Sequence, residues 1–262
     1  MGGGRDKNGV AIYRRRNGVY ERLDGKPVNR KTAESEFRKK INEAKTNKEF
    51  GDIMIARYGK NNVKPSFLKK DLGMLKKVMT TIDDLEGKYP ELKDKVHTFT
   101  GRNASAFSSM NIDGSLNIND VWSTLDNPRL YNDNDGWSYK NTTPESIIAH
   151  EFAHAIESKL IEKMYPDAFK NGEIDTSAGL ALELQARSAW STDSVLFDAR
   201  DRALSRLGYT SVQQASSTIS KYAETSLGEL FAEAFGDVYS NGDKASNASK
   251  VFTEELIKEL RR

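Results

Sequence analysis

His150-Glu151-Phe152-Ala153-His154 is the stretch that decides how the rest of the sequence is interpreted. Its two histidines stand four residues apart, close to one helical turn, so both imidazoles can point at one metal ion. A glutamate between them can act as a base beside that metal. The chain has only three histidines, and two of them fall here. The alternative is that both merely cap or pair with charges on a polar helix face, but the rarity of the pattern favours a metal site.

The flanking residues predict the helix that such a site needs. Thr143 followed by Pro144 is typical of a helix start, with threonine as the N-cap and proline at the first helical position. Glu151 then lies about 100° round the helix from His150, towards the edge of the same face. Apolar residues recur at helical spacing and predict one buried stripe: Ile147, Ile148, Phe152, Ala155, Ile156 and Leu160.

A catalytic zinc site takes three protein ligands and a water, so one ligand remains to be found. Cysteine is absent, and the third histidine, His97, lies in a strand-like run at residues 96–100, where we expect a packing or solvated role. Residues 222–235 offer a better candidate, because Glu229 and Glu233 share one face of a predicted helix that is otherwise apolar. Glu229 would be the ligand, and Glu233 would accept the free ring N–H of a ligand histidine. The alternative is an amphipathic helix whose acids face water.

Together the two segments resemble a known family. H-E-x-x-H followed by Y-x6-E-x-F-A-E-A-F is similar to the gluzincin metallopeptidase domain of anthrax lethal factor and its relatives, among them the Pro-Pro endopeptidases and domains attached to phage head proteins. The resemblance covers about residues 96–240 and is specific at residues 150–157 and 222–235. This chain departs from the family in having Ala153 where many relatives have glycine, and in the length of the intervening segment 155–228.

The resemblance implies a role for each site residue. The zinc ligands would be His150, His154 and Glu229, and the general base would be Glu151. Two further residues would support them, Glu233 as the carboxylate behind a ligand histidine and Tyr222 as the tyrosine that stabilises the oxyanion.

Composition limits the classes of protein to consider. The chain has 262 residues, 37% of them hydrophobic, which is enough for a substantial core. No segment approaches the length of a membrane span, so we expect no membrane partner. Without cysteine there are no disulfides and no thiolate zinc sites, and the start of the chain lacks the apolar stretch of a secretory signal. These observations leave the compartment open.

The overall charge of +2 conceals an asymmetry. Residues 1–100 hold 24 Lys and Arg against 14 Asp and Glu, and residues 101–262 hold the remaining 16 against 24. Part of the basic excess is Arg14-Arg15-Arg16, which with Gly18-Val19-Tyr20 and Asp24-Gly25 predicts a short hairpin. This piece could contact nucleic acid, an acidic partner or the acidic half of the same chain, and the alternative is a solvated basic surface.

The remaining segments divide into helices and one β region. From about residue 31 to 89 the pattern is helical, with these positions expected to be buried: Phe37, Ile41, Phe50, Ile53, Ile55, Leu68, Leu72, Leu75, Val78 and Ile82. Residues 106–112 and 115–119 flank Asp113-Gly114 and predict a hairpin with a two-residue turn, which either pairs with an extended substrate or only covers the core. Residues 126–137 predict an irregular rim without an EF-hand spacing. Residues 178–207 predict a helix, and 208–217 a turn.

We therefore expect a zincin-like α+β fold, with a small twisted sheet packed on the H-E-x-x-H helix and a helical C-terminal part. Residues 1–95 would form a basic, mainly helical N-terminal extension, and residues 96–262 the metallopeptidase domain. The expected function is a zinc endopeptidase acting on a protein or peptide substrate. One alternative is a structural protein of a phage or mobile element with a non-catalytic zinc site, and another is a nucleic-acid-binding module led by the basic part.

Overall fold

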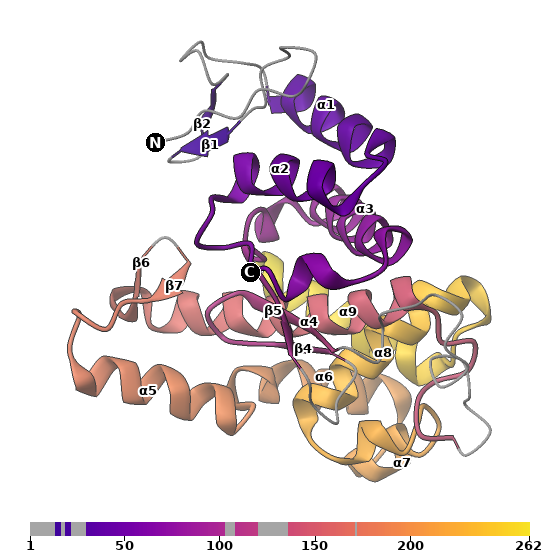
Figure 1. Cartoon of the computed structure of the whole chain (residues 1–262). Helices are drawn as coiled ribbons and strands as arrows, with labels where there is room; N and C mark the ends of the chain where they lie inside the picture. Colours follow the sequence, from indigo (N-terminus) through magenta and orange to yellow (C-terminus); the bar gives the residue numbers. More distant parts are fainter. Residues whose placement is uncertain (1–13, 17–18, 22–29, 103–107, 120–135, 171) are drawn as a thin grey trace.

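The computed structural model describes residues 14–16, 19–21, 30–102, 108–119, 136–170 and 172–262. These residues form a mixed α+β structure that is mostly helical, with one small three-stranded sheet (Figure 1). The α-helices are α1 (Arg30–Glu43), α2 (Asn47–Tyr58), α3 (Leu72–Lys88), α4 (Pro144–Met164), α5 (Leu180–Ser191), α6 (Phe197–Leu207), α7 (Val212–Ser216), α8 (Leu227–Asn241) and α9 (Asn247–Arg261). The strands are β1 (Arg14–Arg16), β2 (Val19–Glu21), β3 (Thr98–Arg102), β4 (Ser108–Met110), β5 (Ser115–Asn119), β6 (Phe169–Lys170) and β7 (Glu173–Ile174).

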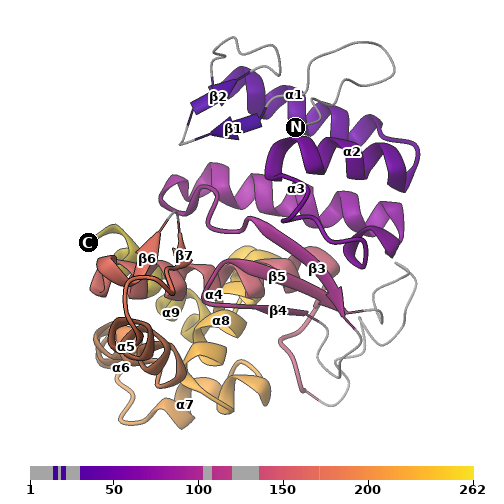
Figure 2. The same ribbon diagram turned by 60° about the vertical axis from the view of Figure 1, so that its left-hand side comes forward.

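Helices α1, α2 and α3 lie together on the β3 side of the sheet, α4 and α8 lie behind the sheet in this view, and α3 packs on α4 (Figure 2). Side-chain caps start two of these helices: Thr46 accepts from the Glu49 N–H of α2, and Asp71 from the Met74 N–H of α3. The predicted buried positions are confirmed as buried or partly buried in the core. Upstream, β1 and β2 pair antiparallel, which confirms the predicted hairpin, whereas Asp24-Gly25 lies outside the described residues.

The three-stranded sheet has the order β3-β5-β4, with β3 parallel and β4 antiparallel to the central strand β5. The predicted hairpin is therefore confirmed, but the prediction of a two-residue turn is wrong. Asn111 N–H donates to Ser115 O at 3.0 Å, which leaves a three-residue loop of Ile112, Asp113 and Gly114. Gly114 has φ +81°, the left-handed conformation that such loops place at their last position.

Helix α4 runs through the centre of the molecule, and its start is as predicted. Thr143 Oγ1 accepts from the Ser146 N–H, Ser146 Oγ accepts from the Thr143 N–H, and Pro144 is the first helical residue. Most of its side chains are buried, because α3, α8 and the edge strand β4 all pack on it. The buried core is continuous from Phe37 to Leu260, and the division of the chain at residue 95 stays a prediction.

The segment between α4 and α8 differs from the prediction. Residues 178–207 do not form one helix, because Asp193 adopts a left-handed conformation (φ 54°) and separates α5 from α6. Residues 208–217 contain the short helix α7 as well as a turn. Most of the predicted rim at 126–137 lies outside the described residues. Among the helices that the structure describes, none is both long and apolar enough to cross a bilayer.

Candidate metal centre

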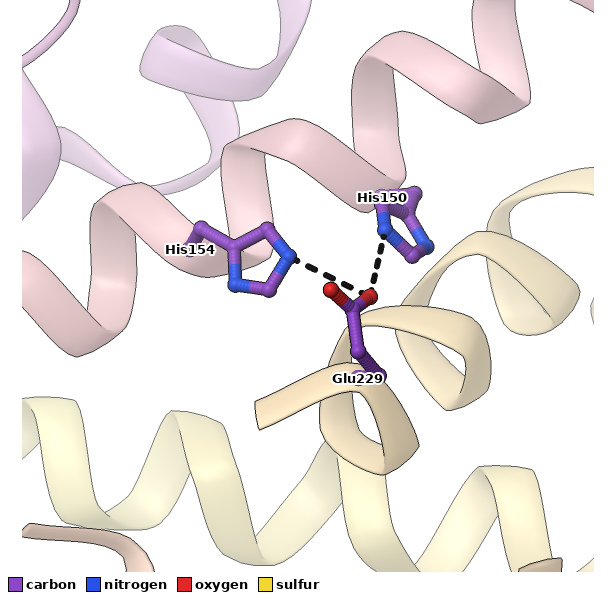
Figure 3. Close-up of side chains that lie close together, drawn as sticks. All are labelled: His150, His154 and Glu229. Atoms are coloured by element: carbon purple, nitrogen blue, oxygen red, sulfur yellow. Dashed lines mark ion pairs between the residues drawn. The ribbon is translucent and has the colours of Figure 1, made fainter. Parts of the chain in front are cut away.

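Helix α4 presents His150, Glu151 and His154 towards the first turn of helix α8. His150 and Glu151 are buried, and His154 is partly buried. The two imidazole rings stand edge to face with centroids 5.2 Å apart, as expected for residues one turn apart on one helix face. Figure 3 shows both rings pointing at the carboxylate of Glu229.

Glu229 reaches the histidines because of where α8 begins. Ser226 is the N-cap of α8, and its Oγ accepts from the Glu229 N–H at 3.1 Å. Ser-x-x-Glu is the sequence of a capping box, but the Glu229 carboxylate turns towards α4 instead of towards the backbone. Its Oε2 atom lies 3.1 Å from His150 Nε2 and 3.5 Å from His154 Nε2 (Figure 3).

These three residues make a donor set that fits a metal ion. One nitrogen of each histidine and one oxygen of Glu229 all lie within 4.8 Å of one another. Glu229 Oε2 is buried and faces the Nε2 atoms of both histidines without a well-aligned hydrogen bond to either. Two imidazoles and one carboxylate are the protein ligands of one known type of catalytic zinc site. Both the geometry and the donor chemistry therefore suit a bound cation.

Glu233 lies behind His150, one turn beyond Glu229 on α8. Its Oε1 is 2.9 Å from His150 Nδ1, the ring nitrogen that points away from Glu229. The other carboxylate oxygen accepts from Ser220 Oγ at 2.7 Å and from the Tyr139 N–H at 3.2 Å. Glu233 is buried and held from three sides, so it can fix the orientation of the imidazole.

His154 has a different partner, which the sequence did not identify. Its Nδ1 lies 3.6 Å from Oε2 of Glu157, a buried residue on the next turn of α4. Asp193, at the break between α5 and α6, meets Glu157 beside Gly228 and accepts a hydrogen bond of 2.9 Å from the Gly228 N–H. A Cβ atom at Gly228 would lie 3.2 Å from both carboxylates, so glycine permits this close approach.

Glu151 lies beside the ligands and is held by the sheet. Ser108, the first residue of β4, donates a hydrogen bond of 2.5 Å from Oγ to Glu151 Oε1. The contact joins residues 43 positions apart in the chain, and no local pattern signals it. Ser108 is therefore a second neighbour of the site that the sequence did not identify.

Tyr222 lies in a short 3₁₀ turn (Tyr222–Glu224) before α8, so it is not on a continuous helix with Glu229. Its hydroxyl nevertheless donates to Glu229 Oε1 at 3.0 Å. The ring stacks on His150, with centroids 5.9 Å apart, and on Trp137, with centroids 5.5 Å apart. The aromatic stack places the phenol beside the metal ligands.

Two further titratable residues, His97 and Glu224, lie away from this cluster. His97 packs against the hairpin loop, with its Nδ1 3.1 Å from Thr98 Oγ1 and 3.6 Å from Glu173, in agreement with the expected packing role. Glu224 is exposed, although it is only five residues before Glu229.

Without a metal, the carboxylates hold both histidines in their charged form. Burial alone lowers the pKa of His150, but Glu229 and Glu233 outweigh it and raise the pKa to about 10. Burial likewise lowers the pKa of His154, which Glu157 and Glu229 raise well above its usual range. Burial raises the pKa of Glu229, yet the two histidines bring it below the ordinary value for glutamate. The carboxylates around His150 and His154 therefore favour a positive charge between these side chains.

Comparison with known proteins adds no assignment, because no family model, curated protein or solved structure matches this chain. The interpretation of the site rests on its residues and their geometry.

Proposed function

We propose that this protein is a zinc-dependent endopeptidase of the gluzincin type with a zincin-like arrangement of sheet and active-site helix. The observation that carries the proposal is the convergence of His150, His154 and Glu229 on one point, with Glu151 adjacent on α4. A purely structural zinc site has four protein ligands, whereas three leave a position for water. Three ligands with the Glu151 carboxylate beside them therefore favour a catalytic zinc site over a structural one.

Each side chain has a distinct task in this proposal. Bound zinc supplies a Lewis acid that polarises the scissile carbonyl and lowers the pKa of water to about 7. Glu151 accepts the proton of the attacking water and passes it to the leaving amine. Burial and the Glu229 charge raise the pKa of the Tyr222 phenol further above 7, so its hydroxyl keeps its proton and can donate to the carbonyl oxygen as negative charge develops there.

The sheet offers a place for an extended peptide. Strand β4 is the edge of the sheet in the order β3-β5-β4, and it packs on α4. Ser108 of this strand contacts Glu151 directly. A peptide that adds to this edge by backbone hydrogen bonds would run past the base, which is the usual way in which an extended segment binds a sheet. The substrate class is therefore an extended peptide or protein segment.

Zinc content and peptide cleavage of the purified chain test the proposal together. We expect one zinc per chain, cleavage of a peptide library, and loss of cleavage with a chelator. Glu151→Gln keeps the shape of the side chain but removes the base, so zinc should stay bound while turnover falls by roughly two to four orders of magnitude. Glu162→Gln is the matched control on α4, because its carboxylate faces Lys95 and Lys159. A fully metallated wild type that cleaves nothing would favour the structural-protein alternative.

A further inference from the structure

The two candidate ligand histidines differ in what holds them from behind. His150 has Glu233 at 2.9 Å, a carboxylate from the ligand helix α8. His154 has Glu157 at 3.6 Å, a carboxylate from its own helix α4. Among the described residues, Glu157 is the acid that faces His154 Nδ1. A ligand histidine usually donates this second ring N–H to a carboxylate or carbonyl, which fixes its tautomer and its ring orientation.

Glu157 does not act alone, because Asp193 meets it at Gly228. Asp193 Oδ2 accepts from the Gly228 N–H at 2.9 Å, and its other oxygen and Glu157 Oε2 would each lie 3.2 Å from a Cβ atom at Gly228. Gly228 directly precedes Glu229. The pair of acids therefore connects the ring of one candidate ligand, His154, to the backbone next to another, Glu229.

This arrangement has features that stability alone does not explain. Two acids are brought together, and Glu157 Oε1 is buried without a hydrogen-bond partner among the described residues. Asp193 also has a left-handed backbone, at φ 54°, which is uncommon for residues other than glycine. Strain and unsatisfied groups of this kind concentrate at functional sites. The segment 155–228, longer than the resemblance leads one to expect, supplies Asp193 itself.

We infer that Glu157 and Asp193 are positioning residues of the metal centre: Glu157 orients the ring of His154, and Asp193 holds the start of α8 so that Glu229 meets that ring. The inference rests on the proposed function for the presence of a metal. It extends that function by assigning a task to the segment between the two metal-binding helices. The competing explanation is that the acids only attach this segment to α4 and α8.

Zinc affinity, measured by competition with a chromophoric chelator, separates the two explanations. We expect Glu157→Gln and Asp193→Asn each to weaken zinc binding by about 10 to 100-fold, the usual loss for a residue behind a ligand. Asp193→Asn keeps an oxygen that can accept from the Gly228 N–H, so α8 should stay attached. Matched controls are Glu162→Gln on α4 and Asp201→Asn on α6, whose acids pair with lysine and arginine. Neither control should alter zinc affinity.

Two further readouts respond to positioning and not to stability. The cobalt(II)-substituted protein should show altered visible absorption bands in Glu157→Gln, because the His154 ring is free to turn, while the bands of Glu162→Gln should match the wild type. The double variant Glu157→Gln/Asp193→Asn should lose less affinity than the product of the single losses, since the two acids act on the same ligands. Full additivity, or unchanged cobalt bands, would count against the inference.

The outcomes distinguish this inference from the proposed function. If the wild type binds zinc and cleaves no peptide, the peptidase proposal fails, and a selective loss of affinity in Glu157→Gln and Asp193→Asn still supports positioning. If both variants bind zinc as tightly as Glu162→Gln, the inference is overturned whether or not the protein is a peptidase. A lower melting temperature of the metal-free variants with unchanged zinc affinity would assign the two acids to attachment alone. A wild type that binds no zinc overturns both proposals.

Discussion

Ser108 Oγ donates a hydrogen bond of 2.5 Å to Glu151 Oε1, which joins the first residue of the edge strand β4 to the proposed general base on α4. Glu151 is buried, so its carboxylate needs hydrogen-bond partners inside the protein. The bond fixes the position of one carboxylate oxygen. It also couples the base to the strand on which we propose that substrate binds.

Replacing this serine should lower turnover without removing the metal. A hydrogen bond to a charged group contributes about 1.5 kcal/mol or more, so we expect Ser108→Ala to reduce kcat/KM by about tenfold. Zinc content should not change, because Ser108 touches no ligand. Ser109→Ala is the matched control, since the neighbouring hydroxyl accepts from Asn117 within the sheet. Equal rates for the two variants would remove Ser108 from the site.

The ligand assignment is tested by three glutamates of one segment. Glu229→Ala should lose most of the zinc, because it removes one of three protein ligands. Glu233→Ala should weaken binding by about 10 to 100-fold, since it only frees the His150 ring. Glu224→Ala should leave the affinity unchanged, because its side chain is exposed. Metal analysis and chelator competition give the order of the three variants. Any other order would show that Glu229 is not the glutamate that binds the metal.

Zinc binding should release protons and strengthen with pH. Glu229 and Glu233 overcome the effect of burial and raise the pKa of His150 from 6.5 to about 10, so the metal-free protein carries imidazolium at pH 7. A zinc ligand must be neutral, so the metal displaces this proton. Titration calorimetry in two buffers with different ionisation enthalpies should reveal the released proton. Binding enthalpies that do not depend on the buffer would contradict the charged cluster.

The same shift sets the stability of the metal-free protein. Because the pKa of His150 is raised on folding, its contribution is fully present below about pH 6.5 and is lost as pH rises towards about 10. The melting temperature of the chelator-treated protein should therefore fall from pH 6.5 to 10. His150→Gln should flatten this dependence.

Most of the site could be predicted from the sequence, because its ligands lie on two helices with local patterns. His150 and His154 are related by one helical turn, and Glu229 and Glu233 by another, so periodicity alone brings each pair to one face. The packing of α4 on α8 then brings the two pairs together. Only the role of Tyr222 needed the resemblance to gluzincins.

Two of the three missed neighbours, Ser108 and Asp193, depend on contacts between distant segments, whereas Glu157 lies only three residues from His154. Ser108 and Asp193 lie 43 and 35 residues from the groups that they contact, Glu151 and Gly228, and serine and aspartate are common in any loop. The break at Asp193 was also missed, since residues 178–207 have the composition of a helix throughout. Tertiary contacts, here the hydrogen bond that the Gly228 N–H donates to Asp193, override that local preference.

Replacing two helical glycines by alanine should change the free energy of unfolding in opposite directions. Gly236 on α8 faces the buried Tyr139 ring, and a Cβ atom there would lie 2.6 Å from the hydroxyl, which donates to Ser146 Oγ. We expect Gly236→Ala to destabilise the protein by about 1 to 3 kcal/mol, because overpacking outweighs the gain in helix propensity. Gly87 on α3 has nothing within 4 Å of the corresponding position, so Gly87→Ala should stabilise by about 0.5 to 1 kcal/mol. Chemical denaturation measures both, and equal effects would mean that Tyr139 can move aside.

Tyr222 gives the sharpest test of the proposed mechanism, because its hydroxyl already lies at the site. It donates to Glu229 Oε1 at 3.0 Å, and its ring stacks on His150 and on Trp137. Tyr222→Phe deletes one donor and almost no volume, so the stack and the melting temperature should be retained. Zinc should stay bound because all three ligands remain.

If the hydroxyl stabilises the oxyanion, the turnover rate should fall by roughly 10 to 1000-fold with little change in substrate affinity. If it only supports Glu229, zinc affinity should fall while the turnover rate of the fully metallated enzyme stays at the wild-type value. Steady-state kinetics at saturating zinc separate these outcomes, and unchanged turnover there would exclude Tyr222 from catalysis.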